Sequence, residues 1–343
     1  MESATTPESD IVQLGKLVGG ELQAQAFYRP IASQMVQVEQ RLRDELRSRY
    51  KILEPVLQHG VMLGGKRLRP ALVLLAGAAS GPLHRDHVTI AAVLEMVHTA
   101  TLVHDDVLDK AQHRRHVPTV NALWDNSTSI LLGDFLFSHS FFLAATLNST
   151  AACQAIGRAS RRVCEGELRQ VLSAGDMLLD EATYLDLIEG KTAELTQVSC
   201  ELGALFSGAS EEQVRGLGEY GRCLGIAFQI ADDYLDLWGD DQTVGKTLGT
   251  DLDQGKMTLP IIRLLETSDE ARRDKIIDVL RCGGVNRLTK IRDFLCDSDA
   301  ARYTRQTAER YRDRAIASLD CLPPSAAKAS LAQIASFSVD RRF

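Results

Sequence analysis

Two copies of one acidic pattern, Asp-Asp-x-x-Asp, lie far apart in this sequence. Their carboxylates are Asp105, Asp106 and Asp109 in the first copy and Asp232, Asp233 and Asp236 in the second. Residues four positions apart share one face of a helix, so each copy presents two carboxylates side by side. Such like charges repel one another unless cations bridge them. Because Mg2+ is usually held by a few carboxylates together with substrate phosphates, the pattern predicts two acidic helices that face one cavity and bind a diphosphate through several Mg2+ ions.

A single copy of this pattern is more often a solvated, charged helix face. Both copies, however, are embedded in apolar helical sequence, LVHDDVLD and QIADDYLDLW. An unpaired buried carboxylate costs on the order of several kcal/mol. Six carboxylates in this setting therefore require metal ions or cationic side chains as partners.

Basic residues lie near both acidic copies and in a glycine-containing segment, GGKRLRP, that begins at residue 64. They are Lys66, Arg67 and Arg69 in that segment, Arg114 and Arg115 after the first copy, and Lys246 and Lys256 after the second. Arginine forks match phosphate oxygens. The stretch from Gly60 nearly matches a nucleotide-binding P-loop, but Arg67 replaces the required Ser or Thr and no strand precedes it, which excludes that interpretation.

Three further polar positions have two interpretations each. His98 lies seven residues before Asp105 and nearly on the same helix face, so it is either a phosphate donor or a core histidine with satisfied hydrogen bonds. Gln229 shares a face with the second acidic copy, and its alternative is a hydrogen bond between helices. Lys191 and Thr192 would equally suit an ordinary solvated turn.

The elements that must position these residues are predicted to be helices, because apolar residues recur at three- to four-residue spacing and alternating strand patterns are scarce. Helices are expected up to about residue 58, followed by a loop at His59 and Gly60, and again over 88–109 and 219–238. A long Gly- and Asp-rich loop follows and resembles a lid. The sequence has 343 residues, 45% of them hydrophobic, and no Pro/Gly/Ser-rich linker, which favours one all-α domain over 11–343 after a disordered start at 1–10.

Composition narrows the class of protein further. The net charge of -7 argues against non-specific nucleic-acid binding. The seven cysteines are scattered without a Cys-x-x-Cys pair, and the polar start lacks a secretory signal, so a reduced, cytoplasmic protein is expected. The longest apolar run, which starts at Ala71, is shorter than the roughly 20 residues that span a bilayer, so any membrane contact should be peripheral.

Seven segments of the sequence together resemble the ordered motifs of trans-isoprenyl diphosphate synthases. They are GGKRLRP, EMVHTATLVHDDVLD with the Arg pair that follows, GDFLF, EGEL, KTAEL, FQIADDYLD and GKTLGTDLDQGKMTLP, spanning residues 64–260. The resemblance implies an all-α, single-domain helical bundle around a central cavity, the isoprenoid synthase type I fold, and a homodimer. It also implies an enzyme that adds isopentenyl diphosphate to an allylic diphosphate with Mg2+ as cofactor.

The resemblance also assigns roles to individual residues. Isopentenyl diphosphate binding is expected at Lys66, Arg69, His98 and Arg115. Allylic diphosphate binding is expected at Arg114, Lys191, Thr192, Gln229, Lys246 and Lys256. The expected Mg2+ ligands are Asp105, Asp109, Asp232 and Asp236. The residues expected to be catalytic are Asp105, Asp109, Asp232, Lys191 and Lys246. No nucleophilic side chain is required, because positioning and charge stabilisation drive an ionisation.

Ala100 and Thr101, one turn before the first acidic copy, are predicted to line the tunnel that receives the growing product. In the family, large aromatic residues at these positions give short products, so small residues predict a long chain, heptaprenyl to decaprenyl, of the kind attached to quinones. Val93, Leu94 and Val97 would continue an apolar bore.

One departure is His116, where the family usually has Gly. The alternatives left open are a short-chain farnesyl or geranylgeranyl synthase, a non-catalytic subunit and a class I terpene cyclase. A non-catalytic subunit typically loses an acidic motif. A cyclase usually has an Asn/Ser/Glu second motif and needs neither GGKR nor His98.

Overall fold

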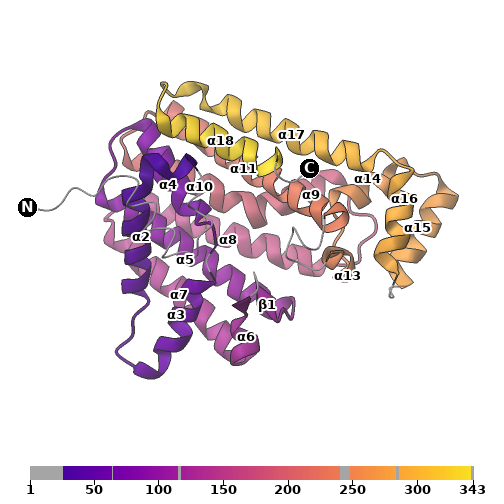
Figure 1. The fold of residues 1–343 in the computed structure, drawn as a ribbon, viewed down its shortest axis with the longest axis horizontal. Helices are drawn as coiled ribbons and strands as arrows, with labels where there is room; N and C mark the ends of the chain where they lie inside the picture. The colour runs from indigo at the N-terminus through magenta and orange to yellow at the C-terminus, as the bar shows by residue number, and fades with distance from the viewer. Residues whose placement is uncertain (1–25, 64, 115–116, 240–247, 283–285, 341–343) are drawn as a thin grey trace, which may run out of the picture. The chain divides into compact units, whose positions relative to one another are not determined.

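The computed structural model describes residues 26–63, 65–114, 117–239, 248–282 and 286–340, and for Asp340 the backbone only. These residues are almost entirely helical (Figure 1). The two strands found among them, β1 (His113–Arg114) and β2 (Val117–Pro118), form one short antiparallel pair. The prediction of an all-α fold is therefore confirmed. The predicted disorder of residues 1–10, and Arg115, His116 and Lys246, lie outside the described residues.

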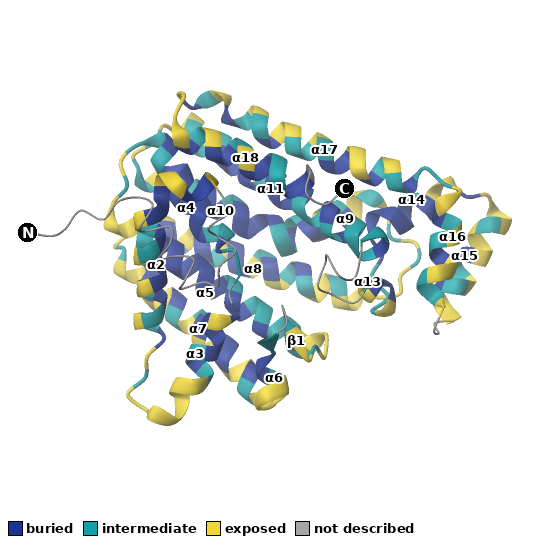
Figure 2. Ribbon diagram, viewed as in Figure 1, coloured by how far each residue is buried: buried dark blue, intermediate teal, exposed yellow. Residues whose placement is uncertain are grey.

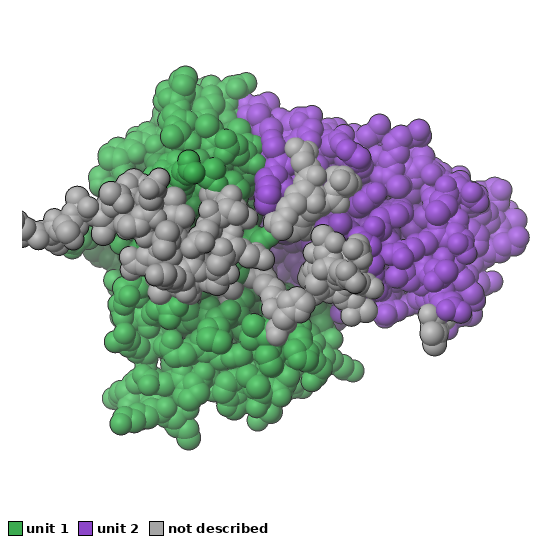
Figure 3. All heavy atoms as spheres, in the orientation of Figure 1, with its two compact units in different colours: residues 1–160, 195–221, 318–334 green, residues 161–194, 222–317, 335–343 purple. Residues whose placement is uncertain are grey.

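The chain divides into two compact units, coloured separately in Figure 3. Unit 1 comprises residues 1–160, 195–221 and 318–334, and unit 2 comprises residues 161–194, 222–317 and 335–343. The single domain expected over residues 11–343 stays a prediction. The helices that contribute residues to both units are α8 (Thr150–Leu172), α10 (Glu194–Phe206), α11 (Glu211–Trp238), α17 (Ala300–Ser318) and α18 (Ala326–Asp340).

Unit 1 is built around α5. Its own elements are η2 (Ala26–Ile31), α2 (Ala32–Glu45), η3 (Lys51–Leu53), α3 (Glu54–Met62), α4 (Leu68–Ser80), α5 (Arg85–Leu108), α6 (Val120–Leu123), α7 (Asn126–Thr146) and η5 (Leu319–Cys321). Helices α2, α4 and α7 pack against α5, and α4 and α5 are mostly buried (Figure 2). This packing explains why α5 is apolar on most sides, with Asp105 and Asp106 of the first acidic motif in its last turn.

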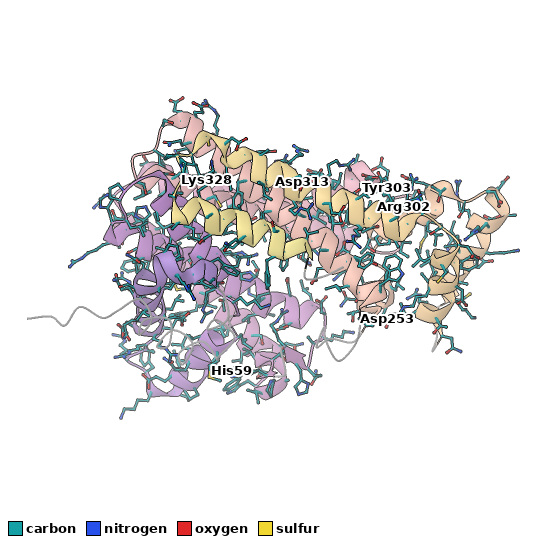
Figure 4. The ribbon with its side chains drawn as sticks, turned by 45° about the horizontal axis from the view of Figure 1, so that its top comes forward. His59, Asp253, Arg302, Tyr303, Asp313 and Lys328 are labelled. Atoms are coloured by element: carbon teal, nitrogen blue, oxygen red, sulfur yellow. The ribbon has the colours of Figure 1, made fainter. Side chains whose placement is uncertain are left out.

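Two helix boundaries in unit 1 test the sequence-based predictions. The prediction of a loop at His59 and Gly60 is wrong, because α3 continues through both residues to Met62. The ring Nε2 of His59, which is labelled in Figure 4, bonds to the carbonyl oxygen of Pro118 at 2.8 Å, and this contact holds the last turn of α3. By contrast, the GGKRLRP segment starts a helix as expected, with Pro70 in the first turn of α4.

Helix α7 is long and apolar enough to cross a membrane by length and composition, with 21 residues and 39% of its apolar window buried. It is the one such helix among the described residues, and a core helix of a soluble protein passes the same test. Part of its surface is exposed and apolar, including Leu131 at 67% and Phe142 at 64%. The rest of its surface packs mainly on α5, with further contacts to α6 and α3.

Unit 2 has its own hydrophobic core, formed by buried residues of its helices and of the C-terminal half of α11. Its own elements are α9 (Glu181–Ile188), η4 (Glu189–Ala193), α13 (Thr250–Asp253), α14 (Leu259–Thr267), α15 (Glu270–Cys282) and α16 (Arg287–Cys296). The η4 segment is π-helical and links α9 directly to α10. Single π-helical turns inside helices occur frequently at functional sites, and this one contains Lys191 and Thr192.

Candidate active site

The first acidic motif occupies the end of α5, in unit 1. Asp105 is half-buried and Asp109 is exposed, whereas Asp106 between them is only 1% exposed. Nε of Arg114 donates to Oδ1 of Asp106 at 2.9 Å, and Nη2 of the same guanidinium lies 2.8 Å from that oxygen in an ion pair. Burial raises the pKa of the Asp106 carboxyl, and Arg114 opposes that shift. Asp105 and Asp109 thus lie on the less buried side of α5, whereas the side chain of Asp106 is buried and pairs with Arg114.

Arg114 was predicted to bind the allylic diphosphate. In the structure its side chain bonds to Asp106, so it holds the first motif to the strand β1 that follows it. Its contact with a substrate stays a prediction.

The basic residues of the GGKR segment separate into two kinds. Lys66 and Arg69 are half-buried, as is His98 on α5. Arg67, by contrast, is 4% exposed and is paired with Glu39 and Glu95 in the interior of unit 1. From the sequence, Arg67 is a candidate cationic partner for the acidic motifs or for a phosphate. In the structure its guanidinium instead forms ion pairs with Glu39 and Glu95.

The second acidic motif lies on α11, in unit 2, and repeats the arrangement of the first. Asp232 and Asp236 are half-buried, and Asp233 between them is 3% exposed. The two carboxylate oxygens of Asp233 accept hydrogen bonds from the Tyr184 hydroxyl at 2.6 Å and from Nε2 of Gln229 at 2.8 Å. Burial and the neighbouring Asp251 raise the pKa of Asp233, against the effect of these two donors.

Gln229 extends this network to the π-helical segment. Its Oε1 accepts a hydrogen bond from the Thr192 hydroxyl at 2.8 Å. The alternative interpretation of Gln229, a hydrogen bond between helices, is therefore confirmed in the structure. Together the side chains of Tyr184, Asp233, Gln229 and Thr192 form one continuous chain of hydrogen bonds between α9, α11 and η4.

Asp236 organises the backbone at the start of α13. Its Oδ1 accepts from the amide of Thr250 at 3.1 Å, and its Oδ2 accepts from the amide of Asp251 at 3.2 Å. Burial and the charge of Asp251 raise the pKa of Asp236 to about 7, although the two amides act in the opposite direction. Asp232 contributes to the same shift. Negative charge is therefore crowded around the second motif.

A cavity of about 70 Å³ in unit 2 lies beside this crowded region. The polar residues that line it include Gln170, Lys191, Gln229, Asp233, Asp251 and Lys256. Nζ of Lys191 lies 2.6 Å from Oε2 of Glu167 and donates to Oε1 of Gln170 at 2.7 Å. Nζ of Lys256 lies 3.8 Å from Oδ1 of Asp251. Lys191, Thr192, Gln229 and Lys256, four of the residues predicted for the allylic site, thus lie on or next to one cavity.

The chemistry of the acidic residues suits a hard cation. Their donors are carboxylate oxygens, and Asp251 adjoins Asp236, whose Oδ2 accepts the Asp251 amide at 3.2 Å. A bound cation would relieve the repulsion between such neighbouring carboxylates. Among the described residues no group of three or more His, Cys, Asp or Glu side chains is arranged as a complete metal site. Mg2+ commonly uses only one or two carboxylates and completes its coordination with phosphates and water, so each motif fits it.

The first motif lies in unit 1 and the second in unit 2. That the two face one cavity stays a prediction. The same holds for the tunnel: Ala100 is fully buried, and Thr101 is half-buried with its hydroxyl donating to the carbonyl of His98 at 2.7 Å.

Comparison with known proteins decides the family. A family model described as polyprenyl synthetase matches residues 50–294. This chain belongs to the polyprenyl synthetase family. It is 34% identical over 311 residues to octaprenyl diphosphate synthase of Escherichia coli, covering 90% of this chain and 96% of that protein. It is 35% identical to an all-trans-nonaprenyl-diphosphate synthase of Rhodobacter capsulatus, with 92% and 98% coverage.

The fold of this polyprenyl synthetase is also that of its solved relatives. A polyprenyl synthase from Caulobacter crescentus, solved with calcium and isoprenyl diphosphate, matches with a TM-score of 0.87 and 35% identity over 92% of this chain and 97% of that one. The isoprenoid synthase fold predicted from the sequence is therefore confirmed. The enzyme class is likewise established as a trans-prenyltransferase.

Sequence reasoning missed three parts of the site in this synthetase. Tyr184 gave no signal, because it lies two helical turns before Lys191 in an ordinary amphipathic segment. Asp251 lies inside the quoted GTDLDQGK motif, so its acidic character in a Gly-rich loop was a usable signal. Arg67 pairs with Glu39, 28 residues before it, and with Glu95, 28 residues after it. No local sequence pattern predicts contacts at this separation.

Proposed function

We propose that this prenyltransferase adds isopentenyl diphosphate units to an allylic diphosphate with Mg2+, and makes a long all-trans polyprenyl diphosphate for a quinone side chain. The observation that carries the proposal is the arrangement shared by the two acidic motifs. In each, the middle aspartate is buried and hydrogen-bonded, at Asp106 and Asp233, and the outer pair is left more exposed on one helix face. Two such pairs are what a metal-bound diphosphate requires.

The residues that would hold Mg2+ are Asp105, Asp109, Asp232 and Asp236. When bound, Mg2+ neutralises the diphosphate and makes it a better leaving group. Lys191 and Lys256, which line the cavity in unit 2, supply positive charge for the allylic diphosphate. Lys66, Arg69 and His98 are the described candidates for the isopentenyl diphosphate, and their half-buried side chains leave them accessible.

The chemistry needs positioning more than it needs reactive side chains. The allylic C–O bond breaks, with its electron pair leaving on the diphosphate, and the double bond of isopentenyl diphosphate attacks the resulting cation. A proton then leaves the new carbocation, and the released diphosphate accepts it. The hydrogen-bond chain from Tyr184 to Thr192 supports this step by fixing α11 relative to η4, so that charged groups need not reorganise during ionisation.

The long product is proposed from the small side chains at Ala100 and Thr101. The residues below them on α5, Val93, Leu94 and Val97, are all apolar and fully buried. Growth past this point requires that no bulky ring block the helix face, and none is present at these five positions.

We also propose that the enzyme is a cytoplasmic homodimer with peripheral membrane contact for product release. The exposed apolar side chains of α7, among them Leu131 and Phe142, support an interface with a second copy. Light scattering should give twice the mass of one chain. Replacing both residues with Glu should give a monomer, whereas a wild-type chain that already has the mass of one copy would contradict the dimer.

The function is tested with purified protein, Mg2+, farnesyl diphosphate and labelled isopentenyl diphosphate, by resolving the dephosphorylated products by length. A ladder ending in heptaprenyl to decaprenyl alcohols is expected, and EDTA or Asp105→Asn should suppress it. A farnesyl- or geranylgeranyl-length product would keep the reaction and overturn the long-chain proposal. Absence of any extension would favour a non-catalytic subunit, and a hydrocarbon released from the allylic substrate alone would favour a cyclase.

A further inference from the structure

The backbone of Arg67 adopts an unusual conformation at the start of α4. Its φ of 51° and ψ of 41° place it in the left-handed region, which residues with a Cβ seldom occupy. Its carbonyl accepts the amide of Ala71 at 3.1 Å, so Arg67 caps the helix at the point where the GGKR segment enters it. A residue persists in this conformation only when its surroundings determine it.

Those surroundings are contributed by three other helices. Nε of Arg67 donates to Oε1 of Glu39 on α2 at 2.5 Å, and Nη1 donates to Oε1 of Glu95 on α5 at 3.0 Å. Nη2 donates to the carbonyl of Val61 on α3 at 3.0 Å. The side chains of Arg67, Glu39 and Glu95 are at most 4% exposed, so solvent does not screen this network.

A second contact holds the residue before it. The hydroxyl of Tyr28, which is 1% exposed, donates to the carbonyl oxygen of Lys66 at 2.5 Å. The segment is therefore fixed twice, through the backbone of Lys66 and through the side chain of Arg67. Lys66 and Arg69, on either side of Arg67, are half-buried, whereas Arg67 between them is buried.

Stability alone is a poor explanation for this network. It buries two carboxylates against one guanidinium, and Oε2 of Glu95 is buried with no hydrogen-bond partner among the described residues. Buried ion clusters of this kind are often no more stable than well-packed apolar side chains of the same volume. The network does, however, fix the backbone conformation of Arg67, which lies between the cationic residues Lys66 and Arg69.

We propose that Arg67 is a positioning residue for the isopentenyl diphosphate site, and that Glu39, Glu95 and Tyr28 act through it and through the Lys66 carbonyl. The proposal rests on the function proposed above, in which Lys66 and Arg69 bind that substrate. Arg67 itself does not touch the substrate. Its role is to keep Lys66 and Arg69 in one geometry before the substrate arrives, so that binding does not have to order them.

The test uses two variants and a matched control. Tyr28→Phe removes only the hydroxyl that bonds to Lys66, and Arg67→Lys keeps the charge but cannot bond to Glu39 and Glu95 as a planar fork. Tyr220→Phe is the control, since Tyr220 is equally buried and its hydroxyl donates to a backbone carbonyl, that of Leu331, at 2.8 Å. Each protein is titrated with isopentenyl diphosphate in a calorimeter, and KM is measured for both substrates.

Tyr28→Phe should raise Kd and KM for isopentenyl diphosphate about three- to tenfold, the ratio expected for one hydrogen bond. Arg67→Lys should raise them by about tenfold or more, because small displacements of binding groups are costly. KM for the allylic diphosphate should stay within about twofold in both variants, because neither hydrogen bond involves a residue assigned to that site. Every constant of Tyr220→Phe should also stay within about twofold of the wild-type value. Amide exchange over residues 65–71 should quicken in Tyr28→Phe and not in Tyr220→Phe.

Equal changes in KM for the two substrates would overturn the positioning role. So would a folded Tyr28→Phe variant whose Kd and KM for isopentenyl diphosphate equal those of the wild type. Tyr28→Phe decides the question even where Arg67→Lys does not fold. A wild-type chain that extends prenyl substrates while the variants behave like the control would remove this inference and leave the proposed function intact. A wild-type chain that neither binds isopentenyl diphosphate nor extends a primer would overturn both.

Discussion

Tyr184 donates its hydroxyl to the buried carboxylate of Asp233 at 2.6 Å, and so ties α9 to the middle residue of the second acidic motif. The residue it holds is not one of the expected metal ligands. It lies between two of them, Asp232 and Asp236, and its fixed side chain sets the rotation of α11 at that point. The first motif has the same arrangement, with Arg114 as the partner of Asp106.

Tyr184→Phe should lower the free energy of unfolding by about 1–3 kcal/mol, because one oxygen of a buried carboxyl loses its donor. It should also raise KM for the allylic diphosphate, since Asp233 shares its other oxygen with Gln229. Urea unfolding and steady-state kinetics measure these effects. Tyr303→Phe is the control, because its hydroxyl bonds to the half-buried Glu181, which water can reach. Equal losses in the two variants would show that Tyr184 has no special role.

Gly166→Ala should disturb the π-helical segment. A Cβ at Gly166 would lie 2.8 Å from the backbone nitrogen and 3.2 Å from the Cα of Lys191, so the η4 backbone must move. Because Lys191 lies on the cavity in unit 2, we expect turnover to fall about tenfold or more. Gly157→Ala on the same helix is the matched control.

A Cβ at Gly157 meets nothing within 4 Å, so this substitution should leave turnover unchanged and raise stability by about 0.5–1 kcal/mol through helix propensity. If Gly166→Ala behaves like Gly157→Ala in a turnover assay, the close approach of α8 and η4 does not control Lys191.

Ala100→Phe should shorten the product, because a ring at this fully buried position would occupy the predicted tunnel. Overpacking should cost about 1–3 kcal/mol of stability as well, so the fold is checked by thermal unfolding. Thr101→Ala keeps the neighbouring position small and should leave the product length as in the wild type. Unchanged length in Ala100→Phe would exclude the assignment of the tunnel to this face of α5.

Stability should fall as the pH is lowered below about 6.5, in part because of His87 on α5. Burial lowers the pKa of His87 from its usual 6.5, and its Nε2 lies 3.1 Å from the carbonyl oxygen of Gly203. Between 6.5 and this lowered pKa the unfolded chain binds a proton that the folded chain does not, so the free energy of unfolding decreases with decreasing pH. His87→Gln should flatten this part of the curve of Tm against pH, and an unchanged slope would show that other groups cause it.

The fold class and the two acidic helices could be predicted because they depend on short-range regularities. The apolar spacing over 88–109 and 219–238 corresponds to α5 and to the second half of α11, with boundaries within a few residues for α5. The start of α4 at GGKRLRP followed from Pro70. The loop predicted at His59 and Gly60 was wrong because α3 runs through both residues, and Gly60 faces Leu132 on α7 from within this helix.

The contacts of the buried residues Asp106, Asp233 and Arg67 could not be predicted, because most of them join residues that are distant in sequence. Local spacing shows that Asp105 and Asp109 share a face, but it does not show that Asp106 and Asp233 are the buried members with different partners. Asp106 is held by a cation and Asp233 by two neutral donors. The interpretation of Arg67 was the clearest error of this kind. It lies among other basic residues and was therefore grouped with them, but its side chain is buried because it forms ion pairs with Glu39 and Glu95, which are distant in sequence.

The π-helical η4 places a constraint on chain length rather than on residue type. A π-turn holds one more residue than an α-turn, so the continuous helix from α9 through η4 to α10 contains an inserted residue. Deleting one residue here would restore a regular helix and rotate everything on one side of it by about 100° relative to the other. Thr192 would then no longer meet Gln229. Among members of the family, a change in the length of this segment should therefore be rarer than changes in its amino acids.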